Sequence, residues 1–385
     1  MQILVEGWRF ISQSYAVVNQ FQLLEMLKYP DLELFHREMP YLANWQRTSG
    51  ILSAAEEAAL ANIPEPPPNL KPDVVLRMNM PFNLTPSGAD RTYVFGLTEN
   101  GIVQNSMRMR MKAPSLRPFH QDTDVIIITS SNWSREGFIN SGADGDRVVV
   151  VPIGIDPRTC YPLSDGDRRA LRTQFGWDDR FIFLNVGAMS DRKGIVPLLK
   201  AFATVVHRYP QASLVLKGND SLYNSRDCVV DTLNRSLTES ERAKVVPNLA
   251  YIGEDWSFDR VAQLYQAADA YVSPYLAEGF NMPVLEAIAC GLPVICTAGG
   301  PTDDFTRSEF AWRIESTLEV MTIDREPRYI FNPNLDNLIY LMERAIGEPE
   351  FLTSSRQTGP KFVADRYTWE EVVHRLLDIL EYKRE

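Results

Sequence analysis

Short apolar runs alternate with stretches of helical periodicity along the whole chain. Buried strands are expected at residues 2–6, 73–78, 92–97, 124–129 and 147–152, with helices at 16–27 and 130–142 between them. The alternation restarts further on, with strands expected at 181–187, 212–218, 248–253, 269–275 and 293–297 and helices at 194–208 and 258–268. Continuous apolar runs of this length are typical of parallel strands that are covered on both faces. The pattern therefore predicts an α/β protein with two doubly wound parallel sheets in tandem.

The turn-rich segment 154–169 follows the fifth expected strand and is the best candidate for a domain boundary. We expect a first domain at 1–158 and a second at 159–364. The terminal segment 365–385 contains an amphipathic helical pattern that suits packing back on the first domain.

Composition and charge narrow the class of protein. The chain of 385 residues is long enough for two or three domains, and its net charge of −11 argues against binding nucleic acid over its whole surface. The chain has no run of eighteen consecutive apolar residues, so no transmembrane helix is expected. Glu6 interrupts the short apolar run at the start, so no signal peptide is expected. Cys290 and Cys296 lie in an apolar stretch and are expected to be reduced core residues. We expect a cytoplasmic protein, with peripheral contact with the inner face of a membrane left open.

Two carboxylates frame the segment EGFNMPVLE, in which Glu278 and Glu286 stand eight positions apart. The segment follows the strand expected at 269–275, and Pro283 stands where a helix is expected to begin. Ligands of open α/β sheets bind at the carboxyl ends of strands, and the amides at a helix start favour a phosphate. Carboxylates on either side of a phosphate suit the hydroxyls of a nucleotide sugar, Glu286 on the first helical turn for the ribose and Glu278 for the sugar. The alternative is that Glu286 stabilises its helix and Glu278 is a solvated loop residue.

A second loop, GAMSDRKG, follows the strand expected at 181–187 and opens the next helix. Cations are unfavourable at a helix start, yet Arg192 and Lys193 stand there. This misfit favours an anion site over an exposed pair of charges.

Together these segments resemble the retaining glycosyltransferases of the GT-B fold, in the large family 4 group. The resemblance is carried by NVGAMSDRKGIVPLLKAF (185–202), LYQAADAYVSPYLAEGFNMPVLEAIACGLPVI (264–295) and VVVVPIGIDP (148–157), and it covers most of the chain from 124 to 300. It implies two Rossmann-like domains that face a central cleft, with the donor bound by the second domain and the acceptor by the first. Glu278 and Glu286 match the E-x7-E signature of the group.

The resemblance also implies roles for particular residues. Lys193 with Arg192 would hold the donor diphosphate, Glu286 the ribose, and Glu278 with the 279–282 backbone the transferred sugar. The base would pack near 253–255. The implied donor site consists of Gly187, Arg192, Lys193, Gly253, Glu254, Asp255, Glu278, Gly279, Phe280, Asn281, Met282, Leu285 and Glu286.

The chain departs from the group at two positions of this site. Ala188 stands where the group commonly has Arg, and Asn281 stands where it commonly has Gly. We expect Arg192 to supply the missing charge and the Asn281 side chain to face the donor.

The acceptor side is less well marked in the sequence. Its candidates are Gly7, Ser14, Tyr15, Glu99 and Asn100, with Glu99 nearest the reaction centre and, with Glu278 and Lys193, one of three candidate catalytic residues. An ordinary strand–helix connection explains residues 7–15 equally well.

Two other features of the first part are interpreted as structural. His120 is expected to be a surface or structural residue. The basic run at 105–120 is interpreted as a solvated segment, with phosphate or membrane binding as the alternative.

The expected reaction moves a sugar from a UDP- or GDP-sugar to a hydroxyl acceptor with retention, without a metal or other cofactor. Sugar, lipid-linked and protein acceptors all remain open. The D-x-D patterns at 122–124 and 144–146 are interpreted as structural. The alternatives are a degenerate GT-B subunit that acts as a binding partner, or a nucleotide-sugar epimerase or phosphorylase on the same frame.

Overall fold

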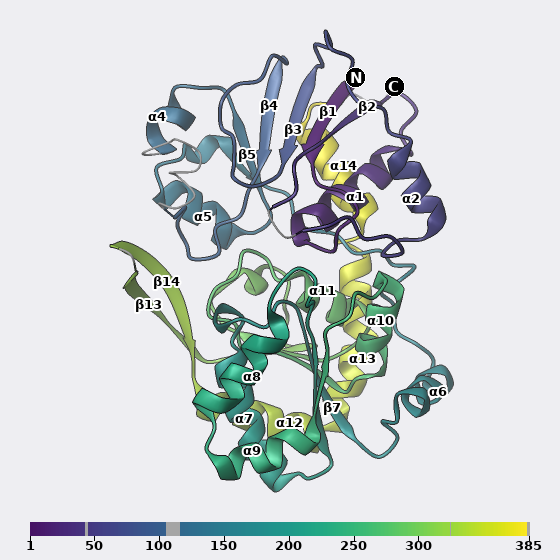
Figure 1. Ribbon diagram of the computed structural model, residues 1–385, viewed down its shortest axis with the longest axis vertical. Coiled ribbons are helices and arrows are strands. Elements are labelled where there is room, and N and C mark those ends of the chain that lie inside the picture. Colours follow the sequence, from purple (N-terminus) through teal and green to yellow (C-terminus); the bar gives the residue numbers. More distant parts are fainter. Residues whose placement is uncertain (43–44, 105–115, 324, 383–385) are drawn as a thin grey trace. The chain divides into compact units, whose positions relative to one another are not determined.

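The computed structural model describes residues 1–42, 45–104, 116–323 and 325–382. It divides into two compact units (Figure 1). The first comprises Met1–Gly154, Met321–Arg328 and Tyr367–Glu385, and the second comprises Ile155–Val320 and Tyr329–Arg366.

The first unit is built on a parallel sheet with the strand order β2-β1-β3-β4-β5-β6. Its strands are β1 (Gln2–Gly7), β2 (Glu33–Glu38), β3 (Val74–Met78), β4 (Arg91–Phe95), β5 (Ile126–Thr129) and β6 (Val148–Val150). Its helices are α1 (Ser14–Met26), α2 (Ala54–Ala61), α4 (Leu116–Gln121), α5 (Asn132–Asn140), the 3-10 turn η1 (Gly145–Arg147) and α14 (Trp369–Ile379). The register places Val5 of β1 between His36 of β2 and Leu76 of β3.

The second unit repeats this design with the strand order β12-β11-β10-β7-β8-β9, again parallel. Its strands are β7 (Phe181–Val186), β8 (Ala212–Lys217), β9 (Leu249–Ile252), β10 (Ala270–Ser273), β11 (Val294–Thr297) and β12 (Ala311–Ile314). Its helices are α6 (Asp165–Phe175), α7 (Ile195–Arg208), α8 (Ser225–Ser236), α9 (Glu239–Val245), α10 (Phe258–Ala267), α11 (Met282–Ala289), α12 (Leu335–Gly347) and α13 (Pro349–Ala364). Its 3-10 turns are η2 (Asp191–Lys193), η3 (Val246–Asn248) and η4 (Pro301–Asp304). A separate two-stranded ribbon is formed by β13 (Ser316–Ile323) and β14 (Glu326–Pro333).

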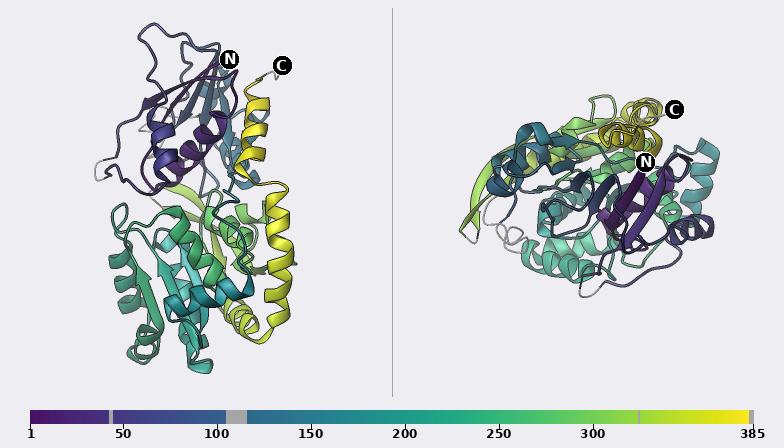
Figure 2. Two further views of the ribbon diagram at one scale, coloured as in Figure 1. Left: turned by 90° about the vertical axis from the view of Figure 1, so that its right-hand side faces the viewer. Right: turned by 90° about the horizontal axis from the view of Figure 1, so that it is seen from above.

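The terminal helix α14 lies beside α1 within the first unit, as Figures 1 and 2 show. Trp369 stacks on Phe21 with ring centroids 5.4 Å apart, and the Tyr93 hydroxyl donates to the Ile379 carbonyl at 2.9 Å. Gly154 leaves the space for this contact, because a Cβ there would lie 2.8 Å from the Trp369 ring. An indole and a helix end from the last twenty residues thus complete the core of the first unit.

All ten expected strands and the expected helices are present, and Ser131 caps α5 by accepting from the Ser134 amide. The edge strands β2 and β12 were missed. Edge strands carry charged and polar side chains toward solvent, which breaks the apolar run that marks the interior strands. The ribbon β13–β14 was missed for the same reason, since most of β13 is exposed.

Several smaller expectations can be compared with the structure. Cys290 and Cys296 are buried free thiols. Asp144 accepts from the Asp146 amide at the start of η1, so this D-x-D pattern is structural. None of the described helices is both long and apolar enough to cross a membrane. Of the basic run at 105–120, residues 105–115 lie outside the described part of the chain.

His120 is a structural residue and is buried. Its Nδ1 accepts from the Asp144 amide at 2.9 Å, and its Nε2 has no hydrogen-bond partner among the described residues. Burial, with the charge of Arg147 adding to it, lowers the His120 pKa from 6.5 to about 4. The folded protein therefore holds a neutral imidazole.

Acid should destabilise the fold through His120. Because the folded-state pKa lies below that of the unfolded chain, the stability is present above pH 6.5 and is lost as the pH falls through about 4. The loss amounts to about 3 kcal/mol for a shift of this size. The difference in unfolding free energy between wild type and His120→Asn, measured from pH 7 to pH 4, should fall by this amount. The exposed His207→Asn is the control, and an equal slope in both variants would contradict the assignment.

Candidate functional site

Two loops meet at the carboxyl edge of the second sheet because the strands that precede them are neighbours. β7 pairs with β10 in parallel, with Tyr271 opposite Leu184. The loop after β7 spans residues 187–194, and we call it the DRKG loop. The loop after β10 spans residues 274–281, and we call it the EGFN loop. These are the two segments in which the sequence predicted a ligand.

Backbone contacts lock the two loops together. The Arg192 carbonyl accepts from the Leu276 amide at 2.8 Å and from the Ala277 amide at 3.1 Å. Gly194 has φ 79°, and a Cβ there would lie 1.9 Å from the Pro274 carbonyl oxygen. Only glycine allows both the left-handed backbone and this close approach.

This arrangement brings the predicted diphosphate residue and the predicted sugar residue into direct contact. Lys193 Nζ forms an ion pair and hydrogen bond with Glu278 Oε1, and Arg192 Nη1 lies 3.6 Å from Glu278 Oε2. Glu278 is only 4% exposed, and a carboxylate buried to this degree is normally paired with a cation. The site thus contains a buried carboxylate flanked by two basic groups.

Asn281 precedes α11 at its N-cap position and corrects one expectation. It has φ 76° and ψ 64°, the left-handed conformation for which glycine is the usual choice and asparagine the next best. Its buried side-chain amide donates to Ser273 Oγ at 3.0 Å, at the end of β10. The side chain is therefore directed to the preceding strand β10 and not to the donor. Asn281 takes the place of the usual glycine and adopts the left-handed backbone that glycine favours.

Glu286 lies in α11 one turn further in than expected, because the first turn of that helix carries no acidic residue. Its Oε2 accepts from the Tyr265 hydroxyl of α10 at 2.7 Å. Burial raises the pKa of Glu286, and the Tyr265 bond opposes that rise. A half-buried carboxylate with one oxygen held by a phenol presents its other oxygen as an acceptor.

The other predicted contacts of the EGFN loop differ in what they can offer. The side chains of Phe280 and Leu285 belong to the core, and Phe280 packs on Phe305 with ring centroids 4.8 Å apart. Gly279 is buried and Met282 is half-buried. Phe280 and Leu285 therefore hold the loop in place, and only their backbone could meet a ligand.

The predicted base region, residues 253–255, is fixed to the loop that follows β8. The Asp220 amide donates to the Gly253 carbonyl at 2.9 Å, and a Cβ on Gly253 would lie 1.9 Å from Asp220 Oδ2. Asn219 Nδ2 donates to Asp255 Oδ1 at 2.6 Å, and Glu254 and Asp255 are exposed. Sequence reasoning missed the 217–220 segment, although its place after a strand was a usable signal.

Gly187, the first residue of the DRKG loop, connects that loop to strand β8. Its amide donates to the Lys217 carbonyl at 3.0 Å, and it has φ 140°. The DRKG loop is thus anchored on β8 as well as on the EGFN loop.

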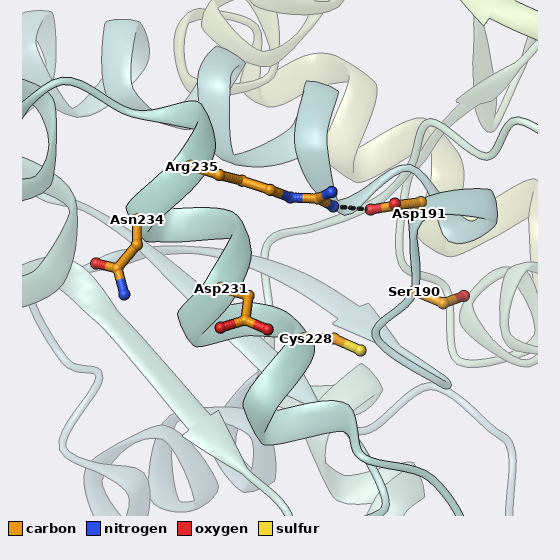
Figure 3. Close-up of a pocket in the computed structure, with 6 residues that line it drawn as sticks. All are labelled: Ser190, Asp191, Cys228, Asp231, Asn234 and Arg235. Carbon is orange, nitrogen blue, oxygen red and sulfur yellow. Dashed lines mark hydrogen bonds and ion pairs between the residues drawn. The ribbon is translucent and has the colours of Figure 1, made fainter.

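A hollow of about 770 Å³ lies beside the DRKG loop, between η2 and α8 (Figure 3). Arg235 extends from the end of α8 to form an ion pair with Asp191 of η2. Both side chains are more than half exposed, so the pair adds little stability. The remaining lining residues are Ser190, Cys228, Asp231 and Asn234.

The acceptor-side candidates lie in the first unit at the ends of β1 and β4. Gly7 ends β1, and a Cβ there would lie 2.7 Å from Asn19 Nδ2. The buried Tyr15 hydroxyl accepts from the Leu97 amide at 3.2 Å, and burial, aided by the Glu99 charge, raises its pKa.

Ser14 and Asn100 are less buried than Gly7 and Tyr15. Ser14 is exposed at the start of α1. Asn100 is half-buried, and its Oδ1 accepts from Gln104 Nε2 at 2.7 Å. The structure therefore places Tyr15 next to the segment that carries Glu99 and leaves Ser14 on the surface.

Gly194→Ala should damage the fold and the site together. The added Cβ meets a backbone oxygen that cannot move without separating the two loops, so a lower midpoint of thermal unfolding is expected. Gly176→Ala is the matched control, because Gly176 has φ 70° and a Cβ added there would have no other atom within 4 Å. That control should cost only the left-handed strain, about 1–2 kcal/mol. Equal destabilisation in the two variants would show that the loop contact is unimportant.

Glu286→Gln should stabilise the protein more at high pH than at low pH. A carboxyl whose folded-state pKa is raised supports the fold below its unfolded value and loses that support as the pH rises through the folded value. Glutamine keeps the shape and removes this loss. Urea unfolding at pH 4 and pH 8 should show a larger difference between variant and wild type at pH 8. The exposed Glu309→Gln is the control, and a difference for Glu286→Gln that does not change with pH would contradict the prediction.

Comparison with known proteins agrees with this geometry. Residues 167–321 match the family model described as glycosyl transferases group 1. The chain is 24% identical to the mannosylfructose-phosphate synthase of Agrobacterium fabrum, over 47% of this chain and 39% of that protein. It is 30% identical to the D-inositol 3-phosphate glycosyltransferase of Rhodococcus jostii, over 67% of this chain and 52% of that protein. The matches thus span about half of the length of these curated relatives, or less.

Solved structures give the fold. The crystal structure of Anabaena HepE in complex with UDP-glucose superposes with a TM-score of 0.70 at 15% identity, covering 99% of each chain. The six-stranded parallel sheets and their helices are those of the GT-B glycosyltransferases. Residues 167–321, which carry both candidate loops, match the glycosyl transferases group 1 family, and the chain has the GT-B fold.

Proposed function

We propose that the protein is a glycosyltransferase that moves a sugar from a UDP- or GDP-sugar to a hydroxyl acceptor. One observation carries this proposal: Lys193 contacts the buried Glu278 at the carboxyl edge of a parallel sheet, and Arg192 lies beside the pair. Cations suit a diphosphate, and a buried carboxylate suits sugar hydroxyls, so one contact unites the two halves of a nucleotide sugar. The family of residues 167–321 and the UDP-glucose bound to HepE support the same donor class.

The donor can replace the ion pair between Lys193 and Glu278 without leaving either group unpaired. A diphosphate would take hydrogen bonds from Lys193 and Arg192, while Glu278 accepts from the hydroxyls of the transferred sugar. Glu286, with one oxygen held by Tyr265, accepts from the ribose. The carboxylates are then satisfied by neutral donors, and the cations by the diphosphate.

The reaction breaks the bond between the anomeric carbon and the β-phosphate oxygen. The acceptor oxygen forms a new bond to that carbon on the face from which the phosphate departs, so the anomeric configuration is retained. The proton of the acceptor passes to the departing phosphate oxygen. Lys193 and Arg192 stabilise the charge that develops on the diphosphate, in the manner of fixed electrostatic catalysis. This route requires no metal, and the acceptor is a sugar, lipid-linked or protein hydroxyl.

A panel of UDP-, GDP- and ADP-sugars tests the proposal by thermal shift and by slow hydrolysis of the donor. At least one UDP- or GDP-sugar should stabilise the wild type and be hydrolysed. Glu286→Ala should weaken that binding, and the double variant Lys193→Met/Glu278→Gln should abolish both signals without leaving one buried charge unpaired.

Lys200→Met is the matched control, since Lys200 is an exposed lysine of α7. Hydrolysis should be unchanged by EDTA, and proton NMR of the transfer product should show the anomeric configuration of the donor. Absence of binding by every nucleotide sugar would refute the proposal. Binding without hydrolysis or transfer would instead identify a degenerate subunit.

A further inference from the structure

Lys217, the last residue of β8, is a buried ammonium without a carboxylate partner. Its side chain is 5% exposed, and its Nζ donates to the Gly218 carbonyl at 2.5 Å and to the Glu254 carbonyl at 2.9 Å. No carboxylate of the described residues lies within ion-pair distance of it. Buried charges are normally paired, because the cost of removing a charge from water is large. This arrangement therefore calls for an explanation beyond packing.

Lys217 connects the DRKG loop with the predicted base region, residues 253–255. Its backbone carbonyl accepts from Gly187 at the start of the DRKG loop, at 3.0 Å. Its ammonium holds the carbonyl of Glu254 in the predicted base region. A single residue thus fixes the spacing between the diphosphate end and the base end of the site.

The ammonium also keeps one N–H available. A lysine has three donors, and two of them are used within the described residues. Burial lowers the Lys217 pKa, while Asp255, Glu254 and Asp220 oppose that shift. Trp256 lies nearby with its ring centre 6.0 Å from Nζ, and the guanidinium of Arg260 lies 3.8 Å from the centre of the same ring. The remaining donor is thus next to an aromatic surface of the kind on which a base can rest.

We propose that Lys217 makes the site select nucleotides whose base carries a ring carbonyl, uracil or guanine, over adenine. This inference rests on the proposed nucleotide-sugar donor. A cationic donor favours the O4 of uracil or the O6 of guanine, whereas adenine presents an amino group, itself a donor, at the corresponding position. Lys217 also acts as a positioning residue, because it holds the 253–255 backbone at the base end.

Nucleotide analogues test the selection on the intact wild-type protein. Calorimetry should show UDP or GDP binding about 10- to 100-fold more tightly than ADP, the range expected for one hydrogen bond to a charged group. Removal of the carbonyl alone should cost a similar factor, with the diphosphate of pyrimidin-2-one riboside compared with UDP and that of 2-aminopurine riboside compared with GDP. Equal affinity for each analogue and its parent, or a preference for ADP, would overturn the inference.

Variants separate selection from a purely structural role. Lys217→Met should lower the ratio of UDP or GDP affinity to ADP affinity to about one, whereas Lys217→Arg should keep part of the preference, because it retains a cationic donor. Lys200→Met should leave the ratio unchanged. If Lys217→Met weakened all three nucleotides by one common factor, Lys217 would be a structural residue only. If the wild type bound none of UDP, GDP and ADP, the proposed donor class itself would fail.

Discussion

The close approach of Gly194 to the Pro274 carbonyl determines how the site of the second unit is assembled. Because a Cβ would lie 1.9 Å from that oxygen, the DRKG and EGFN loops can lie against each other only with glycine at this position. The Arg192 carbonyl then receives two amides of the opposite loop, which fixes the path of the chain up to Glu278. Once these loops are joined, the side chains of Lys193 and Glu278 lie within contact distance. The ion pair is therefore a consequence of backbone packing, and the side chains use a geometry that the backbone has already set.

Three ionisable groups, two buried and one half-buried, lie along one edge of this sheet, and each is satisfied in a different way. Glu278 is neutralised by Lys193 with Arg192 nearby, Glu286 is held by a tyrosine hydroxyl, and Lys217 is held by backbone carbonyls. None of these solutions is the cheapest for stability, since apolar residues would fill the same space without a desolvation cost. Their concentration at the carboxyl ends of β7, β8 and β10, where α/β sheets bind ligands, suits the proposed donor, which carries several hydroxyls and a diphosphate.

The first unit repeats the parallel design, but its polar groups are arranged differently. Tyr15 and His120 are buried with hydrogen bonds to backbone amides, and the buried Arg77 pairs with Glu6 across the neighbouring strands β3 and β1. Its core is completed by α14, which follows the second unit in the sequence and stacks Trp369 on Phe21. The chain therefore returns to the unit in which it began.

The sequence by itself determined the class of fold, because short uninterrupted apolar runs between helical patterns are typical of strands covered on both faces, and their spacing leaves room for crossover helices. It also singled out the two loops that the structure brings together, because charges at a helix start and carboxylates around a glycine-rich turn conflict with local stability. It could not show the edge strands β2 and β12, whose polar side chains hide the pattern, or the direction of Asn281, whose amide is bound by Ser273 eight residues earlier. The contact between Lys193 and Glu278, residues 85 positions apart, and the burial of Lys217 were decided only by the tertiary structure. Strand order and loop packing set which distant side chains meet, and no local pattern along the chain encodes that order.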